Sequence, residues 1–98
     1  MRIPTKAAKD WTACCVVLAT EAMNRSGWTC PNGEKVVCEL IVYWPDKRRR
    51  DASNLEKVLL DGLEAAGVVD DDKWFLPRWM DFSYDKNDPR VEVKVMRA

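Results

Sequence analysis

The stretch that decides the fold runs from Ser53 to Gly67 and reads SNLEKVLLDGLEAAG. Ser53 followed three residues later by Glu56 fits a capping box, a pattern that starts many helices. Apolar and small residues then recur at the three-to-four spacing of one helical face, namely Leu55, Val58, Leu59, Gly62, Leu63 and Ala66. Gly67 suits the left-handed turn that ends a helix. The stretch therefore predicts an amphipathic helix over residues 53–66.

The segments on either side of this helix alternate between helical and extended patterns. Upstream, Thr5 is a candidate N-cap for a first amphipathic helix over about residues 6–24. Residues 36–44 are rich in β-branched and aromatic side chains, which predicts a strand covered on both faces. Downstream, residues 78–84 and 90–96 are extended candidates joined by a polar turn, which predicts a β-hairpin. Together these elements predict a small α/β (α+β) domain, a mixed sheet with two principal helices.

Composition bounds the size and the chemistry of this domain. The 98 residues predict one domain, residues 1–98, whose modest core favours association with a partner. Acidic and basic residues balance at 16 each, so nucleic-acid binding would depend on local charge. Histidine is absent, which excludes imidazole bases, Ser-His-Asp triads and histidine metal sites. No apolar run approaches the ~20 residues that cross a bilayer, so no membrane partner is expected.

The four cysteines are Cys14, Cys15, Cys30 and Cys38. Their spacing matches no zinc pattern and no secretory signal precedes them. A small disulfide framework is one reading. Reduced, mostly buried thiols in a cytoplasmic protein are the better one, because three of the four fall in a predicted helix or strand, where a small apolar side chain is suited.

Charge is concentrated on both sides of the residue 53–66 helix. Four consecutive cations precede it and three consecutive aspartates follow it: Lys47, Arg48, Arg49 and Arg50, then Asp70, Asp71 and Asp72. Guanidinium groups can hold phosphate oxygens, whereas aspartates supply the hard oxygen ligands that Mg²⁺ prefers. The pairing suits a metal-dependent enzyme acting on a phosphate backbone. Taken singly, each feature has a plainer reading as an exposed basic edge, a solvated acidic loop or a helix cap.

The ordered set RRRDASNLEK, LLDGL and GVVDDDK, within about residues 45–73, resembles the RusA family of Holliday-junction resolvases. The resemblance implies a homodimeric, Mg²⁺-dependent endodeoxyribonuclease of bacteria and their prophages. Such an enzyme binds four-way branched DNA in the cytoplasm during recombination and repair. By position, the resemblance implies that Asp51, Lys57 and Asp72 are catalytic. Asp51 and Asp72 would also hold the metal, with Asp71 as an alternative ligand. The DNA-binding residues would be Lys47, Arg48, Arg49 and Arg50.

The chain departs from the family pattern at two places. Ser53 stands where many members carry a further aspartate, and a hydroxyl brings no charge to a metal ion. The usual N-terminal strand is also expected to be missing, which would leave a sheet edge unpaired. These departures leave a second reading open, that of a catalytically weakened or inactive module that binds branched DNA.

Distance is the main geometric question for the predicted site. The helix advances about 20 Å, so Asp51 and Asp72 start from opposite ends of it. The loop after the helix could return the chain, or the two carboxylates could meet across a two-fold axis. Trp74, Phe75 and Trp79 follow the acidic run. They could stack on unpaired bases, but such residues more often fill a core or a dimer interface, and the interface is the expected place for them.

Overall fold

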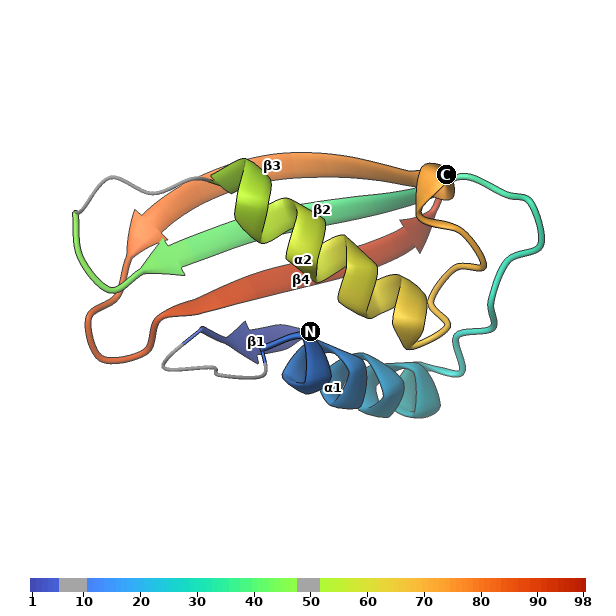
Figure 1. Cartoon of the computed structure of the whole chain (residues 1–98), viewed down its shortest axis with the longest axis horizontal. Helices are drawn as coiled ribbons and strands as arrows, with labels where there is room; N and C mark the ends of the chain where they lie inside the picture. The colour runs from blue at the N-terminus through green and yellow to red at the C-terminus, as the bar shows by residue number, and fades with distance from the viewer. Residues whose placement is uncertain (6–10, 48–51) are drawn as a thin grey trace.

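The computed structural model describes residues 1–5, 11–47 and 52–98. Its elements in chain order are β1 (Arg2–Pro4), α1 (Trp11–Ser26), β2 (Val36–Trp44), α2 (Ala52–Ala65), the 3₁₀ helix η1 (Asp72–Trp74), β3 (Phe75–Tyr84) and β4 (Arg90–Arg97). The strands form one mixed sheet, and both long helices lie on the same side of it (Figure 1). This arrangement confirms the predicted fold class, a small mixed sheet with two principal helices.

β2 is a central strand of a sheet ordered β1-β4-β2-β3. It pairs in parallel with β3 and antiparallel with β4, while β1 pairs antiparallel with the outer edge of β4. Parallel neighbours need a crossover connection, and α2 provides it between β2 and β3. The helix that the sequence predicts best therefore also sets the topology of the sheet.

The predicted hairpin between the last two strands is wrong, because β2 lies between β3 and β4. Two strands that flank a third lie about 10 Å apart, a gap that a connection as short as residues 85–89 can cross. The amide of Asp85 donates to the carbonyl of Trp44 at the end of β2 (2.8 Å). The Asp85 carboxylate accepts from the amides of Asn87 and Asp88. The turn is thus fixed over the end of β2 and does not close a hairpin.

The start of α2 differs from the prediction by one residue. Because Ala52 is the first helical residue, Ser53 lies inside the first turn and not at the cap. The carboxylate of Glu56, expected to complete a capping box, accepts a hydrogen bond from the indole of Trp79 on β3 (2.9 Å). This bond attaches the first half of α2 to the sheet.

The end of α2 follows the prediction closely. Gly67 has a φ of 87°, and its amide donates to the carbonyl of Glu64 (2.9 Å). The amide of Val68 donates to the carbonyl of Leu63 (3.0 Å). These two bonds form a Schellman motif, which stops the helix and turns the chain.

α1 and β1 revise the expected beginning of the chain. α1 continues to Ser26 and ends at Gly27, which has a φ of 71°. The predicted first turn of that helix, residues 6–10, lies outside the described residues. Arg2–Pro4 form a short strand, so the expectation that the N-terminal strand is missing is wrong. Three residues flanked by helix signals were too few to give a recognisable strand pattern.

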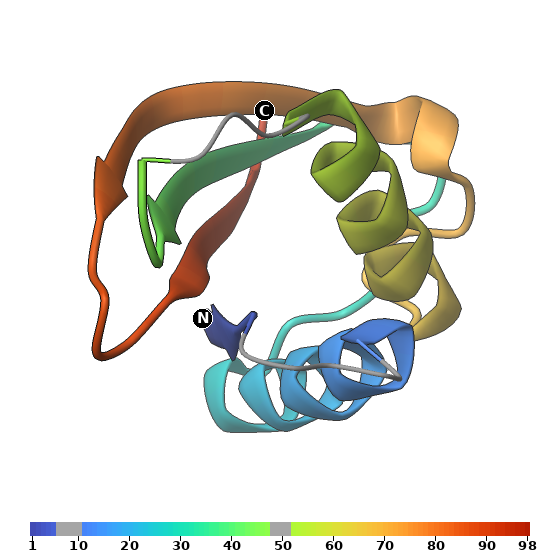
Figure 2. The ribbon, with the colours of Figure 1, turned by 60° about the vertical axis from the view of Figure 1, so that its left-hand side comes forward.

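One apolar core fills the space between the helices and the inner face of the sheet (Figure 2). β2 contributes alternate residues that are at most 1% exposed, namely Val36, Cys38, Leu40 and Val42. The other buried members are Ile3, Cys15, Ala19, Leu59, Leu63, Val68, Val69, Phe75, Val91 and Val93. The remaining residues of β2 are half-buried, and neither described helix lies over that outer face. The prediction that β2 is covered on both faces is therefore wrong for its outer face.

Gly62 allows the two helices to approach closely. A Cβ added there would lie 2.8 Å from the Cβ of Cys15 on α1. Glycine inside a helix costs about 1 kcal/mol relative to alanine. Here the missing side chain lets α1 and α2 share the core without a clash.

The four cysteines are free, as predicted. Cys15 and Cys38 are buried, Cys14 is half-buried and Cys30 is exposed. Burial raises the pKa of the Cys15 thiol from the ordinary 9.0 to about 12, and neighbouring Cys14 adds to the effect. Burial also raises the pKa of Cys38 to about 12, with a smaller contribution from Glu56. The two buried thiols therefore act as small apolar side chains.

The raised thiol pKa values predict a loss of stability at high pH. An unfolded thiol ionises near 9.0 and the folded one near 12, so stability is intact below pH 9 and falls as pH rises towards 12. Each thiol removes up to roughly 1.4 kcal/mol per pH unit in that window. Urea denaturation from about pH 8 to about pH 11 measures the effect. The double substitution Cys15→Ala, Cys38→Val is expected to flatten the fall, whereas Cys30→Ser should follow the wild type. An unchanged pH dependence in the double variant would contradict the assignment.

Candidate functional site

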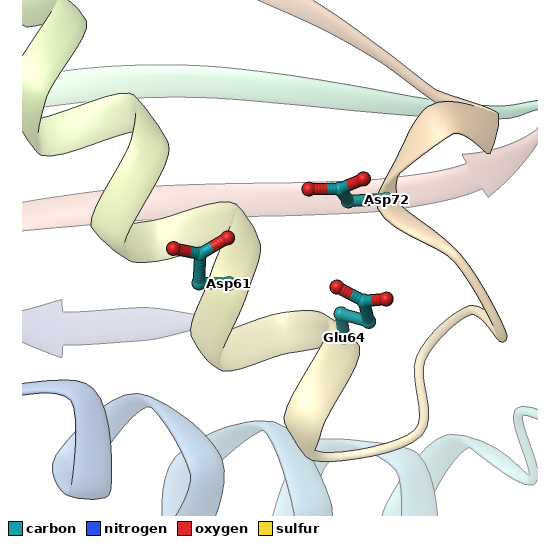
Figure 3. Close-up of side chains that lie close together, drawn as sticks. All are labelled: Asp61, Glu64 and Asp72. Carbon is teal, nitrogen blue, oxygen red and sulfur yellow. The ribbon is translucent and has the colours of Figure 1, made fainter.

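Three carboxylates from two elements converge on the surface beside α2. Asp61 and Glu64 extend from the second half of α2, and Asp72 extends from the start of η1 (Figure 3). One oxygen of each carboxylate lies within 4.8 Å of one oxygen of each of the others. Asp61 and Asp72 are exposed and Glu64 is half-buried. Solvent and a large substrate can therefore reach the cluster.

The loop after α2 brings Asp72 back beside the helix. The Schellman turn at Gly67 reverses the chain, and Val68 and Val69 are then buried at 3% and 2% exposure. The indole nitrogen of Trp28 donates to the carbonyl of Val68 (3.0 Å), which fastens the loop to the segment after α1. Two buried valines thus anchor the loop while the acidic residues that follow remain outside the core.

α2 separates its apolar and polar residues by helical spacing. Leu59 and Leu63 are fully buried against the sheet. Lys57, Asp61 and Glu64 are spaced i, i+4 and i+7, so they share the opposite stripe of the helix. Lys57 is exposed and lies about 6 Å before Asp61 along the helix axis. The predicted catalytic lysine is therefore on the same face of α2 as two of the three carboxylates.

The other predicted site residues have different surroundings. The carboxylate of Asp71 caps η1 by accepting from the amide of Lys73 (3.0 Å), and Asp71 is not a member of the cluster. Lys47 is exposed, with its ammonium 6.0 Å from the centre of the Tyr84 ring. Residues 48–51 lie outside the described part of the chain. The prediction that Asp51 and Asp72 share a cation accordingly stays a prediction.

Sequence reasoning missed Asp61 and Glu64 as members of the site. Both lie on the polar stripe that the predicted helix defines, and Asp61 is part of the LLDGL segment. Their i, i+3 spacing puts them one turn apart on a common face, which is a usable signal. The spacing could not predict the path of the loop after α2. That path brings Asp72 opposite Asp61 and Glu64.

The chemistry of the cluster suits a hard divalent cation. Carboxylate oxygens are the ligands that Mg²⁺ and Ca²⁺ prefer, and Mg²⁺ typically takes one or two carboxylates and keeps several waters. The three carboxylates lie within 4.8 Å of one another, so two of them can bind one ion together, and their exposure leaves room for its waters. Asp61, Glu64 and Asp72 are therefore the described residues that fit such an ion.

A large hollow, about 920 Å³, lies away from the carboxylates. It lies between the second half of α1 and the middle of β4, with further lining from β1, β2 and β3, and its apolar lining includes Ala22, Met23, Trp28 and Val95. The carboxylate cluster stands instead on the exposed surface. An exposed position suits a large substrate.

The comparison with protein families assigns the chain. The family model described as "Endodeoxyribonuclease RusA" matches residues 3–96, which is nearly the whole sequence. The protein therefore belongs to the RusA family of endodeoxyribonucleases, a family of Holliday-junction nucleases. The same comparison confirms the resemblance found in the sequence. A search of curated proteins found no relative.

Among the described residues, neither α1 nor α2 is long and apolar enough to cross a bilayer.

Proposed function

We propose that the protein is a Mg²⁺-dependent nuclease that resolves four-way DNA junctions by paired hydrolysis of phosphodiester bonds, in bacterial or prophage recombination and repair. The observation that carries the proposal is the convergence of Asp61, Glu64 and Asp72 on the helical face that also holds Lys57. Family membership supplies the substrate class. A cytoplasmic location follows from the function, since the DNA of these hosts lies there.

The carboxylates would hold the metal ion. A phosphodiester is a stable anion, and a bound Mg²⁺ supplies charge neutralisation and a more acidic water. Asp72 is the proposed link between the two parts of the site, because it comes from η1 and faces Asp61 and Glu64 on α2 (Figure 3). Asp51 is retained in the proposal as a further catalytic carboxylate before α2, and Asp71 as an alternative ligand that would first have to release the cap of η1.

The basic residues would hold the substrate. Lys57 is one helical turn from Asp61, so its ammonium can contact an oxygen of the phosphate that the cluster engages. Lys47, Arg48, Arg49 and Arg50 precede α2 and would contact the DNA backbone near the branch. Lys57 lies on α2, and the other four cations precede α2 in the sequence, so phosphate binding and hydrolysis are proposed to share one surface.

Paired cutting needs two sites, and we propose that a homodimer provides them. Two identical subunits on a two-fold axis match a junction with approximate two-fold symmetry. Among the described residues, Met1 and β1 pair with the outer edge of β4 as far as Val93, whose amide donates to the carbonyl of Met1 (2.7 Å) and whose carbonyl accepts from the N-terminal ammonium (2.8 Å). We propose that a second copy pairs with the edge beyond Val93, from Lys94 onward.

The proposed function predicts symmetric cleavage of a synthetic junction. In the presence of Mg²⁺, purified protein is expected to nick two strands of like polarity at matching positions and to cut the corresponding duplex far less. End-labelling each strand in turn and separating the products on a denaturing gel measures both cuts. A chelator should stop the reaction. Wild-type inactivity on junctions over a full range of metal concentrations would contradict the proposal.

A second candidate function is a module that binds branched DNA without cutting it. Ser53, where many family members carry an aspartate, is the observation that favours it. This candidate predicts salt-sensitive junction binding that weakens when Arg49 or Arg50 is replaced, together with no cleavage at any metal concentration.

A further inference from the structure

Two aromatic side chains near the end of β3 are strongly exposed. Phe82 is 64% exposed and Tyr84 is 45% exposed, and their rings meet edge to face with centroids 6.5 Å apart. The aromatic residues closer to the acidic run are less exposed. Phe75 is 5% exposed, and Trp74 and Trp79 pack partly buried against the core. Of the aromatic residues after the acidic run, Phe82 and Tyr84 are those whose ring faces a partner can reach.

A β-bulge determines which face of the sheet carries these rings. The register between β2 and β3 shifts after Leu40, which pairs with Trp79, so that Ile41 pairs with Asp81 and Met80 is the extra residue. Val42 then pairs with Phe82, on the face that Val42 buries. Without the extra residue, strict alternation would put Phe82 on the opposite face. The bulge therefore places Phe82 and Tyr84 on the α2 side of the sheet.

A hollow of about 540 Å³ lies next to these rings. Its lining comes from the ends of β2 and β3 and from the first residue of α2, namely Val42, Trp44, Ala52, Trp79, Met80, Asp81 and Phe82. The volume is within the range of sites that bind small, flat organic molecules. The aromatic surface is thus bordered by a cavity at the N-terminal end of α2.

Positive charge adjoins the same surface. The ammonium of Lys47 lies 6.0 Å from the centre of the Tyr84 ring. Aromatic faces beside a cation suit a ligand that combines flat bases with a charged backbone. A purely apolar partner would gain nothing from that cation.

From this juxtaposition we infer that Phe82 and Tyr84 form a stacking platform for unpaired bases of the DNA at the branch point. Lys47 holds an adjoining phosphate. The inference rests on the proposed function and deepens it, because it names the residues that distinguish a branched substrate from a fully paired one. Stacking on an aromatic side chain strengthens binding by about tenfold for each base.

Comparison of three DNA ligands tests this platform. Fluorescence anisotropy in Ca²⁺, which suppresses turnover, measures affinity for a four-way junction, for single-stranded oligothymidine and for a blunt duplex. The double substitution Phe82→Ala, Tyr84→Ala is expected to weaken junction and single-strand binding about tenfold or more while changing duplex binding little. Phe82→Tyr keeps the ring and should bind like the wild type. Val17→Ala, which removes a side chain that is 56% exposed on α1, is the matched control.

The other outcomes separate the platform from the proposed nuclease activity. If the double variant binds all three DNA ligands more weakly by the same factor, the two rings contribute to DNA binding in general and not to stacking on unpaired bases. If the double variant binds all three ligands as the wild type does, the rings do not contact the DNA. A wild-type dimer that becomes a monomer in the double variant, measured by light scattering, would show that a second copy covers the rings. Wild-type binding to oligothymidine without junction cleavage would support the platform and contradict the nuclease. Failure to bind any of the three DNAs would overturn both.

Discussion

Replacing Asp72 with Asn is expected to reduce junction cleavage about 100-fold or more while leaving junction binding intact. Asp72 comes from η1 and faces the carboxylates of Asp61 and Glu64 on α2. The substitution therefore removes the one negative charge that η1 contributes to the cluster. The amide keeps the size of the side chain. Its effect should therefore fall on the reaction and not on the fold. Single-turnover cleavage with Mg²⁺ and anisotropy with Ca²⁺ measure the two quantities separately.

Asp70→Asn is the matched control for this experiment. Asp70 belongs to the same acidic run and is exposed, but it lies outside the carboxylate cluster. Its substitution removes the same charge from the same loop and is expected to leave cleavage near the wild-type rate. Full activity in Asp72→Asn, or equal losses in the two variants, would show that the position of Asp72 in the cluster has no special role.

The double substitution Asp61→Asn, Glu64→Gln is expected to lower the affinity for a divalent ion by roughly tenfold or more, because affinity depends on the number of charged ligands. Calorimetric titration with Mn²⁺ measures the affinity of the free protein without any DNA. The two positions are one turn apart on the exposed stripe of α2, so the fold should tolerate the change. The double substitution Glu21→Gln, Asp70→Asn, at two exposed positions outside the cluster, is a suitable control for the loss of two negative charges.

Ser53→Asp distinguishes this metal position from one at the start of α2. Ser53 precedes Asp61 by two helical turns, about 12 Å along the axis, so a carboxylate there would not share an ion with Asp61. The substitution is expected to leave the Mn²⁺ affinity of the Asp61, Glu64 and Asp72 cluster unchanged. If Ser53→Asp instead raises affinity and cleavage while the double variant has no effect, the metal binds at the other end of the helix.

The candidate site was only partly predictable. Asp72 and Lys57 were predicted from their order in the chain, and the structure places Asp72 beside the face of α2 that carries Lys57. Asp61 and Glu64 were not identified, although their spacing on the helix was visible. Phe75 is buried in the core, whereas Phe82 and Tyr84, which the sequence analysis did not single out, are exposed. A bulge of one residue decides their face, and no local pattern in the sequence marks it.

The sequence by itself determined the elements whose signals are local. Helical spacing and Gly67 define α2 to within a residue, and the β-branched run defines β2 as Val36–Trp44. The family is likewise readable from the chain, because its motif is a matter of residue order. Side-chain spacing and backbone preference act over a few neighbours, so these features need no knowledge of distant contacts.

Only the tertiary structure decided which elements are neighbours. β2 lies between β3 and β4, so the connection from β3 to β4 crosses the end of β2 and does not form the expected hairpin. The burial of Val68 and Val69 returns the loop so that Asp72 lies opposite Asp61 and Glu64. Both results come from competition among long-range contacts for one apolar core, and the energy of those contacts is not encoded in any short segment.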